Sequence, residues 1–113
     1  MINEAIILAG GLGTRLRSVV ADLPKCMAPV NGIPFIHFIV AYLKNEGIRK
    51  FIFSLGYKNE VITAYLDYSF EGIDKKYIIE TEQLGTGGAI KKAANAAESE
   101  NVIVFELKKN SKW

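Results

Sequence analysis

Four short apolar segments, separated by stretches with helical spacing, constrain the fold of this 113-residue chain more than any other feature. They are rich in β-branched and aromatic residues, which favour strands. The segments are Glu4–Ala9 (EAIILA), Lys50–Leu55 (KFIFSL), Lys75–Glu80 (KKYIIE) and Asn101–Phe105 (NVIVF). Strands that alternate with helices form βαβ units with right-handed crossovers. The pattern therefore predicts an α/β fold with a mostly parallel sheet, in which the first strand is buried on both faces.

Three stretches between these strands have the composition or apolar spacing of helices. The first begins near Pro34 and ends before Gly47, and the others are Lys58–Tyr68 and Gly87–Ser99. The second stretch carries Val61, Ile62, Tyr65 and Leu66 at helical spacing, and the third is rich in Ala and Lys. In the first, the spacing predicts a core stripe of Phe35, Phe38, Ile39, Tyr42 and Leu43.

Composition and charge narrow the class of protein. The chain is 50% hydrophobic and 23% charged, with a formal net charge of +2, as in an ordinary globular domain. Lys and Arg are spread along the chain, so we expect no nucleic-acid partner. The first residues lack the pattern of a signal peptide, and no apolar run reaches membrane-spanning length. With a single cysteine, these features favour a cytoplasmic protein without membrane attachment.

A glycine-rich segment follows the first predicted strand. Gly10, Gly11 and Gly13 let the backbone N–H groups approach a ligand closely, as phosphate-binding loops do. Arg15 and Lys25 add cations, and the guanidinium of Arg15 can bind two phosphate oxygens at once. The alternative is a plain turn between a strand and a helix. The spacing matches neither GxGxxG nor the GxxxxGK[ST] loop, so we interpret the segment as a phosphate cradle of another kind.

The stretch LAGGLGTRLRSVVADLPKCMAPV resembles the signature of the sugar-phosphate nucleotidyltransferases, LAGGxGTRL followed by PKxMxPV. The PFIHFIVAYLKNEGI helix and the EQLGTGGAI turn agree with the same family, so the resemblance runs from about Ile2 to Val104. It is strongest to bacterial guanylyltransferases that act on heptose 1-phosphate or mannose 1-phosphate. The resemblance implies a Rossmann-like nucleotide-binding topology.

In such a reaction the phosphate oxygen of a sugar 1-phosphate attacks the α-phosphorus of a nucleoside triphosphate and pyrophosphate leaves. By resemblance, Arg15 holds the pyrophosphate, and Lys25 stabilises charge near the α-phosphate and the sugar phosphate. Gly10, Gly11, Gly13 and Thr14 cradle the triphosphate. This chemistry needs positioning and charge neutralisation more than a protein nucleophile.

The end of the third strand and the turn after it supply the base contacts in this family. Glu80 favours GTP, because a carboxylate offers two acceptors to the adjacent N1–H and N2–H donors of guanine. The alternative is a solvated strand end, with Glu82 or Gln83 in the predicted role. Other predicted nucleotide contacts are Leu8 and Ala9 against the base, and Gly85 and Thr86 in the turn.

Two other residues have polar or reactive groups but are not placed in the site. His37 lies in an apolar helical run, where a packed or interfacial histidine is expected. Cys26 is a lone thiol beside Lys25, which we interpret as a passive substitution rather than a reactive group.

After the fourth strand the family continues with an aspartate, in NGD or DGD, that binds Mg²⁺. Here Phe105 is followed by ELKKNSKW, and Glu106 lacks the flanking Gly and Asp, so we assign no metal ligand. We expect residues 1–105 to be the N-terminal part of a nucleotidyltransferase domain and residues 106–113 to be a tail from truncation or a shifted reading frame. Such a chain is expected to have little or no turnover and an unpaired strand edge.

Two other functions fit parts of this pattern. A non-catalytic nucleotide-binding module would keep the triphosphate and base contacts alone. A uridylyl- or thymidylyltransferase would differ in base preference, and an oxidoreductase that binds a dinucleotide is disfavoured by the glycine spacing. The identity of the sugar and the formation of a homo-oligomer are left open by the sequence.

Overall fold

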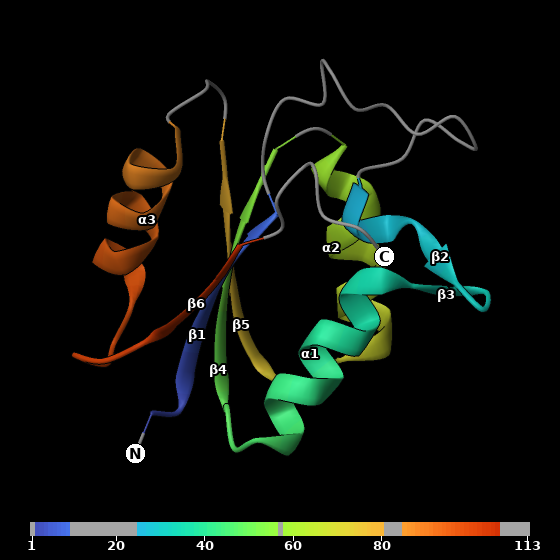
Figure 1. Cartoon of the computed structure of the whole chain (residues 1–113), viewed down its shortest axis with the longest axis horizontal. Helices are drawn as coiled ribbons and strands as arrows, with labels where there is room; N and C mark the ends of the chain where they lie inside the picture. The colour runs from blue at the N-terminus through green and yellow to red at the C-terminus, as the bar shows by residue number, and fades with distance from the viewer. Residues whose placement is uncertain (1, 10–24, 57, 81–84, 107–113) are drawn as a thin grey trace.

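The computed structural model describes residues 2–9, 25–56, 58–80 and 85–106. They form three layers, with a sheet in the middle, helices α1 and α2 on one face and α3 on the other (Figure 1). The main elements are β1 (Glu4–Ala9), α1 (Phe35–Asn45), β4 (Lys50–Leu55), α2 (Asn59–Ser69), β5 (Asp74–Ile79), α3 (Gly85–Ala96) and β6 (Ile103–Glu106). β1 and β4 have the predicted bounds, and the bounds of α2, β5, α3 and β6 differ by one to three residues.

The sheet has the strand order β5-β4-β1-β6, and its three pairings are parallel. Counted along the chain the order is 3-2-1-4, as in Rossmann-type sheets. The chain therefore reverses its direction of winding between β1 and β6, and ligands of such sheets bind at the carboxyl ends of the strands near this point. The expected α/β class and Rossmann-like topology are confirmed.

β1 is fully buried because strands pair with both of its edges and helices cover both of its faces. Ala5, Ile6 and Ile7 have no exposed surface. Ala5 and Ile7 pack into the core under α1 and α2, whereas Ile6 and Leu8 pack under α3. A continuous apolar run is therefore what this position in the sheet requires.

Helix α1 lies where the sequence predicts it, between Pro34 and Gly47. The backbone N–H of Gly47 donates to the carbonyl of Lys44, and that of Ile48 donates to the carbonyl of Leu43 at 3.0 Å. These two bonds form a Schellman motif, which needs a residue with positive φ after the helix. Gly47 has a φ of 103°, which glycine adopts without a steric penalty.

The predicted core stripe of α1 is partly wrong. Phe38 and Tyr42 are 40% and 61% exposed, so they are not core residues. Phe35 is half-buried against the core. The helix is apolar around much of its circumference, so its apolar residues can be grouped into either of two overlapping stripes. Packing against the sheet decides which stripe is buried. The residues on the buried face are Ile36, Ile39, Val40 and Leu43.

A short hairpin before α1 was not predicted. Its strands are β2 (Pro29–Val30) and β3 (Ile33–Pro34), and a 3-10 turn, η1 (Lys25–Met27), precedes it. Asn31 and Gly32 connect the strands with φ values of 54° and 80°. Positive φ at both residues is typical of a type I′ turn, for which Asn-Gly is the preferred dipeptide. No helix in the described part of the chain is long and apolar enough to cross a bilayer.

The amino-terminal ends of the strands lie at one end of the sheet, called the amino edge below, and Glu4 joins two segments there. Its buried carboxylate accepts hydrogen bonds from the backbone N–H groups of Glu98, at 3.1 Å, and Ser99, at 2.7 Å. Glu98 in turn pairs with Lys50 and Lys76. Burial acts to raise the pKa of the Glu4 carboxyl, but these backbone bonds and the charge of Lys50 outweigh it, so the pKa is lowered. This cluster ties the segment after α3 to β1.

The buried face of α1 can be tested with two adjacent residues. Leu43→Ala should lower the free energy of unfolding by about 2–5 kcal/mol, because it leaves a cavity in the core. Tyr42→Ala should change it by about 0.5 kcal/mol or less, because the ring is mostly in solvent. Urea unfolding of both variants measures the difference. Equal destabilisation by the two substitutions would contradict the described orientation of α1.

Replacement of Glu4 by glutamine should lower the free energy of unfolding by about 1–3 kcal/mol at neutral pH. Because the pKa of Glu4 is lowered in the folded state, its stabilisation is complete above the ordinary value of 4.5 and is lost as the pH falls through the native pKa. The difference between Glu4→Gln and the unsubstituted chain should therefore shrink in acid. Urea unfolding over a pH series measures it, with the exposed Glu100→Gln as control. A difference that is constant with pH would show that the carboxylate charge does not act in this way.

Candidate functional site

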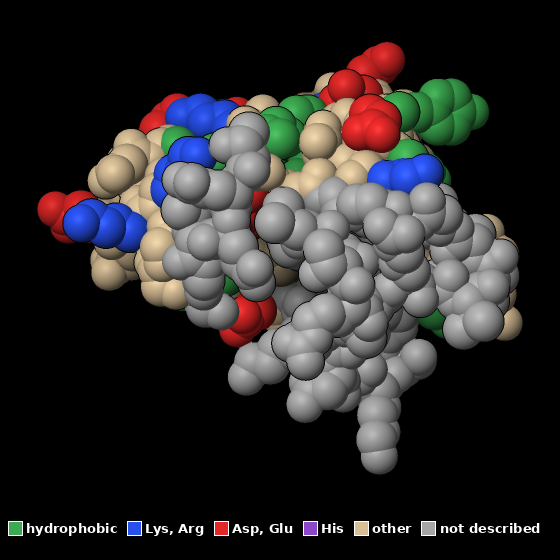
Figure 2. Space-filling view, turned by 90° about the horizontal axis from the view of Figure 1, so that it is seen from above, with side chains coloured by type: hydrophobic (Ala, Val, Ile, Leu, Met, Phe, Trp, Pro, Cys, Tyr) green, Lys and Arg blue, Asp and Glu red, His purple; other side chains and the backbone are tan. Residues whose placement is uncertain are grey.

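The carboxyl ends of the strands meet at one edge of the molecule, opposite the Glu4 cluster. β1 ends at Ala9, β4 at Leu55, β5 just before Glu80 and β6 at Glu106. The chain enters α3 at this same edge (Figure 1). Figure 2 views the molecule from this side, and the acidic and basic side chains of the described residues are interspersed around it rather than separated by sign. The edge is where a Rossmann-type sheet places its ligand.

One row of residues across the sheet defines the face of this site. Leu8 of β1 is in register with Ser54 of β4 and with Glu106 of β6. Leu8 packs under α3, and residues in register point to the same face of a parallel sheet. Ser54 is therefore on the α3 face too, two residues after Ile52, which packs there.

Glu80 is held at this edge by two contacts with β4. Its backbone N–H donates to the carbonyl of Leu55 at 2.7 Å, which extends the β5 ladder by one residue. Its Oε2 accepts a hydrogen bond from the Oγ of Ser54 at 3.0 Å. The carboxylate is thus on the α3 face, the same face as Leu8. This arrangement can present carboxylate oxygens to the donors of a planar ligand at the sheet edge.

The predicted base contacts divide between the two faces. Leu8 is 6% exposed and faces α3, whereas the half-buried Ala9 packs on the side of α1 and α2. A ligand on the α3 face would therefore meet Ala9 through its backbone. Gly85 and Thr86 are the first two residues of α3, whose N-terminus carries a partial positive charge.

Most of the predicted phosphate contacts cannot be placed in this way. Gly10, Gly11, Gly13, Thr14 and Arg15 lie outside the described residues. Lys25 is the first residue of η1, and only its backbone position is described. The roles given to these residues stay predictions.

The described residues contain no cluster of side chains that would hold a metal ion by themselves. No three His, Cys, Asp or Glu side chains among them come together in a way that could hold a metal ion. Glu80 and Glu106 lie at the ends of β5 and β6, which β4 and β1 separate. At the usual strand spacing these two strands are about 14 Å apart, which is too far to share one ion.

His37 is packed, as predicted. Its ring lies against the rings of Phe70 and Tyr65, with centroids 4.9 and 5.9 Å away. Its Nδ1 is 2.9 Å from the hydroxyl of Tyr65. The histidine therefore joins α1 to α2.

The lone thiol is also packed. Cys26 is 3% exposed, and burial raises the pKa of its thiol to about 12. This agrees with a passive residue, because the thiolate is the reactive form.

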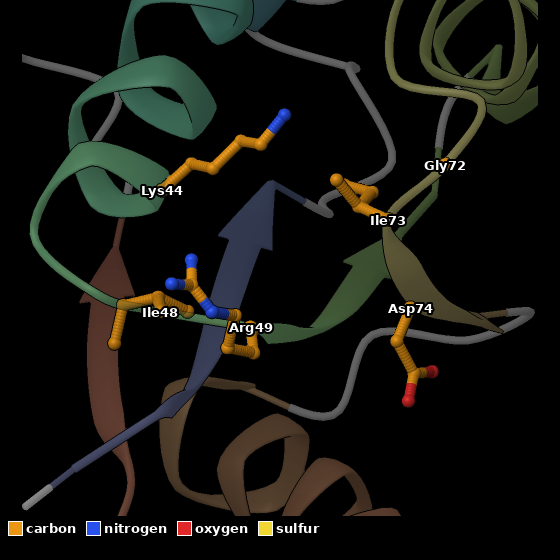
Figure 3. A pocket seen from close by; sticks show the side chains of 6 residues that line it. All are labelled: Lys44, Ile48, Arg49, Gly72, Ile73 and Asp74. Carbon is orange, nitrogen blue, oxygen red and sulfur yellow. The ribbon is translucent and has the colours of Figure 1, made fainter.

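A cavity of about 310 Å³ lies away from the predicted site. Its lining comes from the end of α1 and from residues that precede or begin β4 and β5, so it is at the amino edge of the sheet. Figure 3 shows the side chains of Lys44 and Arg49 extending on one side and Asp74 directed away from them. The cavity is therefore at the opposite end of the strands from the carboxyl edge, where the sequence predicts the nucleotide site.

Ser54 is the residue of this site that the sequence analysis missed. It is a single polar residue near the end of the apolar run KFIFSL. That pattern could have marked it, because a polar residue in a buried strand needs a partner. The partner itself was not evident, since Glu80 lies 26 residues further along the chain.

The model of the nucleotidyl transferase family matches residues 4–111 of the chain. The chain belongs to the nucleotidyl transferase family. The predicted family is thereby confirmed.

Two relatives within the family are similar over most of this chain. It is 55% identical over 102 residues to the D-glycero-alpha-D-manno-heptose 1-phosphate guanylyltransferase of Aneurinibacillus thermoaerophilus, covering 90% of this chain and 44% of that protein. It is 52% identical over 101 residues to the enzyme of the same name from Campylobacter jejuni, covering 89% of this chain and 46% of that protein. The chain thus spans about half the length of these relatives.

A solved structure has the same fold. HddC from Yersinia pseudotuberculosis, complexed with GMP-PN, superposes with a TM-score of 0.80 at 42% sequence identity. The match covers 93% of this chain and 47% of HddC. The α/β architecture described above is therefore that of the corresponding half of a nucleotidyltransferase.

The assignment of Cys26 as a passive residue can be tested with a thiol reagent. With a pKa near 12, the thiol should show almost no reaction with Ellman's reagent at pH 8 in the folded chain. One equivalent should react after unfolding in guanidinium chloride. The absorbance of the thiolate released from the reagent measures the extent of reaction in the folded and in the unfolded chain. Rapid reaction of the folded chain would contradict the burial of Cys26.

Proposed function

We propose that this chain carries the nucleotide-binding half of a sugar 1-phosphate guanylyltransferase. Residues 1–105 would form the N-terminal part of the catalytic domain. The observation that carries the proposal is the Glu80 carboxylate, which Ser54 and the β5 ladder hold at the carboxyl edge on the α3 face. Sequence similarity to heptose 1-phosphate guanylyltransferases supports it.

In this proposal Glu80 reads the base. The N1–H and N2–H groups of guanine are adjacent donors in one plane, and a carboxylate offers acceptors in a matching plane. Uracil and thymine present acceptors beside a single donor, which an amide would meet better. The backbones of Leu8, Ala9 and Gly85 would border the base, and the N-terminus of α3 would lie near it.

The proposed reaction joins a sugar 1-phosphate to the α-phosphorus of GTP. An oxygen of the sugar phosphate forms the new P–O bond, the bond between the α-phosphorus and the bridging oxygen breaks, and pyrophosphate leaves with that electron pair. The roles proposed for this chain are binding and charge neutralisation: the glycine-rich segment and Thr14 around the triphosphate, Arg15 on the pyrophosphate, and Lys25 near the reacting phosphates. Interactions that hold the reacting atoms in line account for much of catalysis in such transfers.

Several finer parts of the proposal come from resemblance alone. Mg²⁺ is the proposed metal, as the family resemblance implies. A cytoplasmic location is proposed in keeping with the absence of a membrane-spanning helix from the described part of the chain. A homo-oligomer is compatible with the proposal.

Nucleotide binding tests the proposal directly. The 113-residue chain should bind GTP more tightly than UTP or dTTP, as measured by isothermal titration calorimetry. Glu80→Gln should weaken GTP binding about tenfold to a hundredfold, because it replaces a hydrogen bond to a charged acceptor. Glu71→Gln, the same substitution at an exposed position in the turn after α2, should leave binding unchanged.

The outcomes separate the candidate functions. Tighter binding of UTP or dTTP than of GTP would contradict the base assignment. Conversion of GTP and a sugar 1-phosphate to a GDP-sugar would show the full transferase activity in this chain. GTP binding without product would instead favour the nucleotide-binding module.

A further inference from the structure

We infer that Ser54 is a positioning residue that sets the base preference of the site by fixing the orientation of the Glu80 carboxylate. The inference rests on the proposed function of Glu80 and adds a second residue to it. Ser54 would not touch the nucleotide. It would act through its hydrogen bond to Oε2 of Glu80.

The side chain of Ser54 is almost completely buried in β4. Among the described residues, Ser54 and Glu4 are the two polar residues with buried side chains, each 1% exposed. The Glu4 carboxylate is accounted for by the backbone N–H groups that it accepts at the amino edge. A buried hydroxyl costs free energy unless it is hydrogen-bonded, and alanine would fill nearly the same volume in this apolar strand. The retained hydroxyl is therefore best explained by its partner, Glu80.

The geometry gives that hydrogen bond a specific effect. The Oγ of Ser54 lies 3.0 Å from Oε2 of Glu80, and the main chain of Glu80 is fixed separately by its bond to Leu55. With the backbone fixed, the remaining freedom of Glu80 is the rotation of its side chain, including the carboxylate plane. A donor at one oxygen restricts that rotation, because hydrogen bonds to carboxylates prefer the plane of the group.

The remaining acceptor positions match what guanine requires. A carboxylate has about four lone-pair positions, and Ser54 uses one of them. Two adjacent donors of one base can bind only if the carboxylate plane coincides with the plane of the base. Without Ser54, the carboxylate would have to lose rotational freedom when the nucleotide binds, and this cost lowers affinity. The affinity for UTP would change little, because uracil does not present two adjacent donors to the carboxylate.

The test compares the affinities of GTP and UTP for the 113-residue chain and its variants by calorimetry. Ser54→Ala should lower the ratio of GTP affinity to UTP affinity about fivefold to tenfold, mainly through weaker GTP binding. Ser69→Ala, the same substitution at the end of α2, should leave the ratio unchanged. Ser54→Thr keeps the hydroxyl and should retain most of the preference. If Ser54→Ala does not unfold cooperatively in a thermal melt, Ser54→Cys replaces it, since a thiol is a similar-sized but weak donor.

A double-mutant cycle establishes whether Ser54 acts through Glu80. In a Glu80→Ala background, Ser54→Ala should cause no further change in the ratio. An unchanged ratio in Ser54→Ala or Ser54→Cys would overturn the inference. The inference would also be overturned if Ser54→Ala lowered the ratio as much in the Glu80→Ala background as in the unsubstituted chain, because Ser54 would then act by another route.

Failure of the proposed function gives a different result. It would be seen in chains that retain Ser54: either the unsubstituted chain has no preference for GTP, or Glu80→Ala keeps that preference. Either result overturns both the base assignment and the role of Ser54. Loss of preference in Glu80→Ala, together with full preference in Ser54→Ala, overturns the role of Ser54 alone.

Discussion

The pairing of β1 on both of its edges is the constraint on which the rest of this structure depends. β4 and β6 occupy its two edges and helices cover its two faces, so Ala5, Ile6 and Ile7 are completely buried. Their alternation assigns one set of side chains to the core under α1 and α2 and the other to the core under α3. Because β1 lies where the winding reverses, its carboxyl end at Ala9 lies at the edge where sheets of this type bind their ligands.

The amino and carboxyl ends of the strands differ in the kind of polar contact that they carry. At the amino edge, Glu4 satisfies the backbone after α3, and Glu98 pairs with lysines of β4 and β5. At the carboxyl edge, the polar contact is between Ser54 and Glu80, and it holds one acidic group in place. The first arrangement stabilises the fold. The second satisfies the hydroxyl of Ser54, which allows a buried polar group near the end of an apolar strand, and we propose that it orients Glu80 for recognition.

The two central strands, β1 and β4, could be predicted from the sequence because burial on both faces leaves a continuous apolar run. Their bounds follow from this signal, and the end of α1 before Gly47 follows from another local signal, the glycine. The stripe of α1 could not be assigned correctly, since Phe38 and Tyr42 are apolar enough for a core but face solvent. The hairpin at Asn31 and Gly32 has a local signal, since Asn-Gly is the dipeptide preferred in a turn with two positive φ values.

The sequence by itself determined the order of strands and helices and the family, because each is written in consecutive or regularly spaced residues; the glycine-rich segment predicts phosphate binding. It also predicts Glu80 as the residue that reads the base, with Glu82 and Gln83 as alternatives. Only the tertiary structure decided that Glu80 and Leu8 share the α3 face, that Ala9 does not, and that Ser54 holds the carboxylate. The physical reason is that these contacts join neighbouring strands far apart in the chain, and their partners follow from the register of the sheet rather than from local sequence.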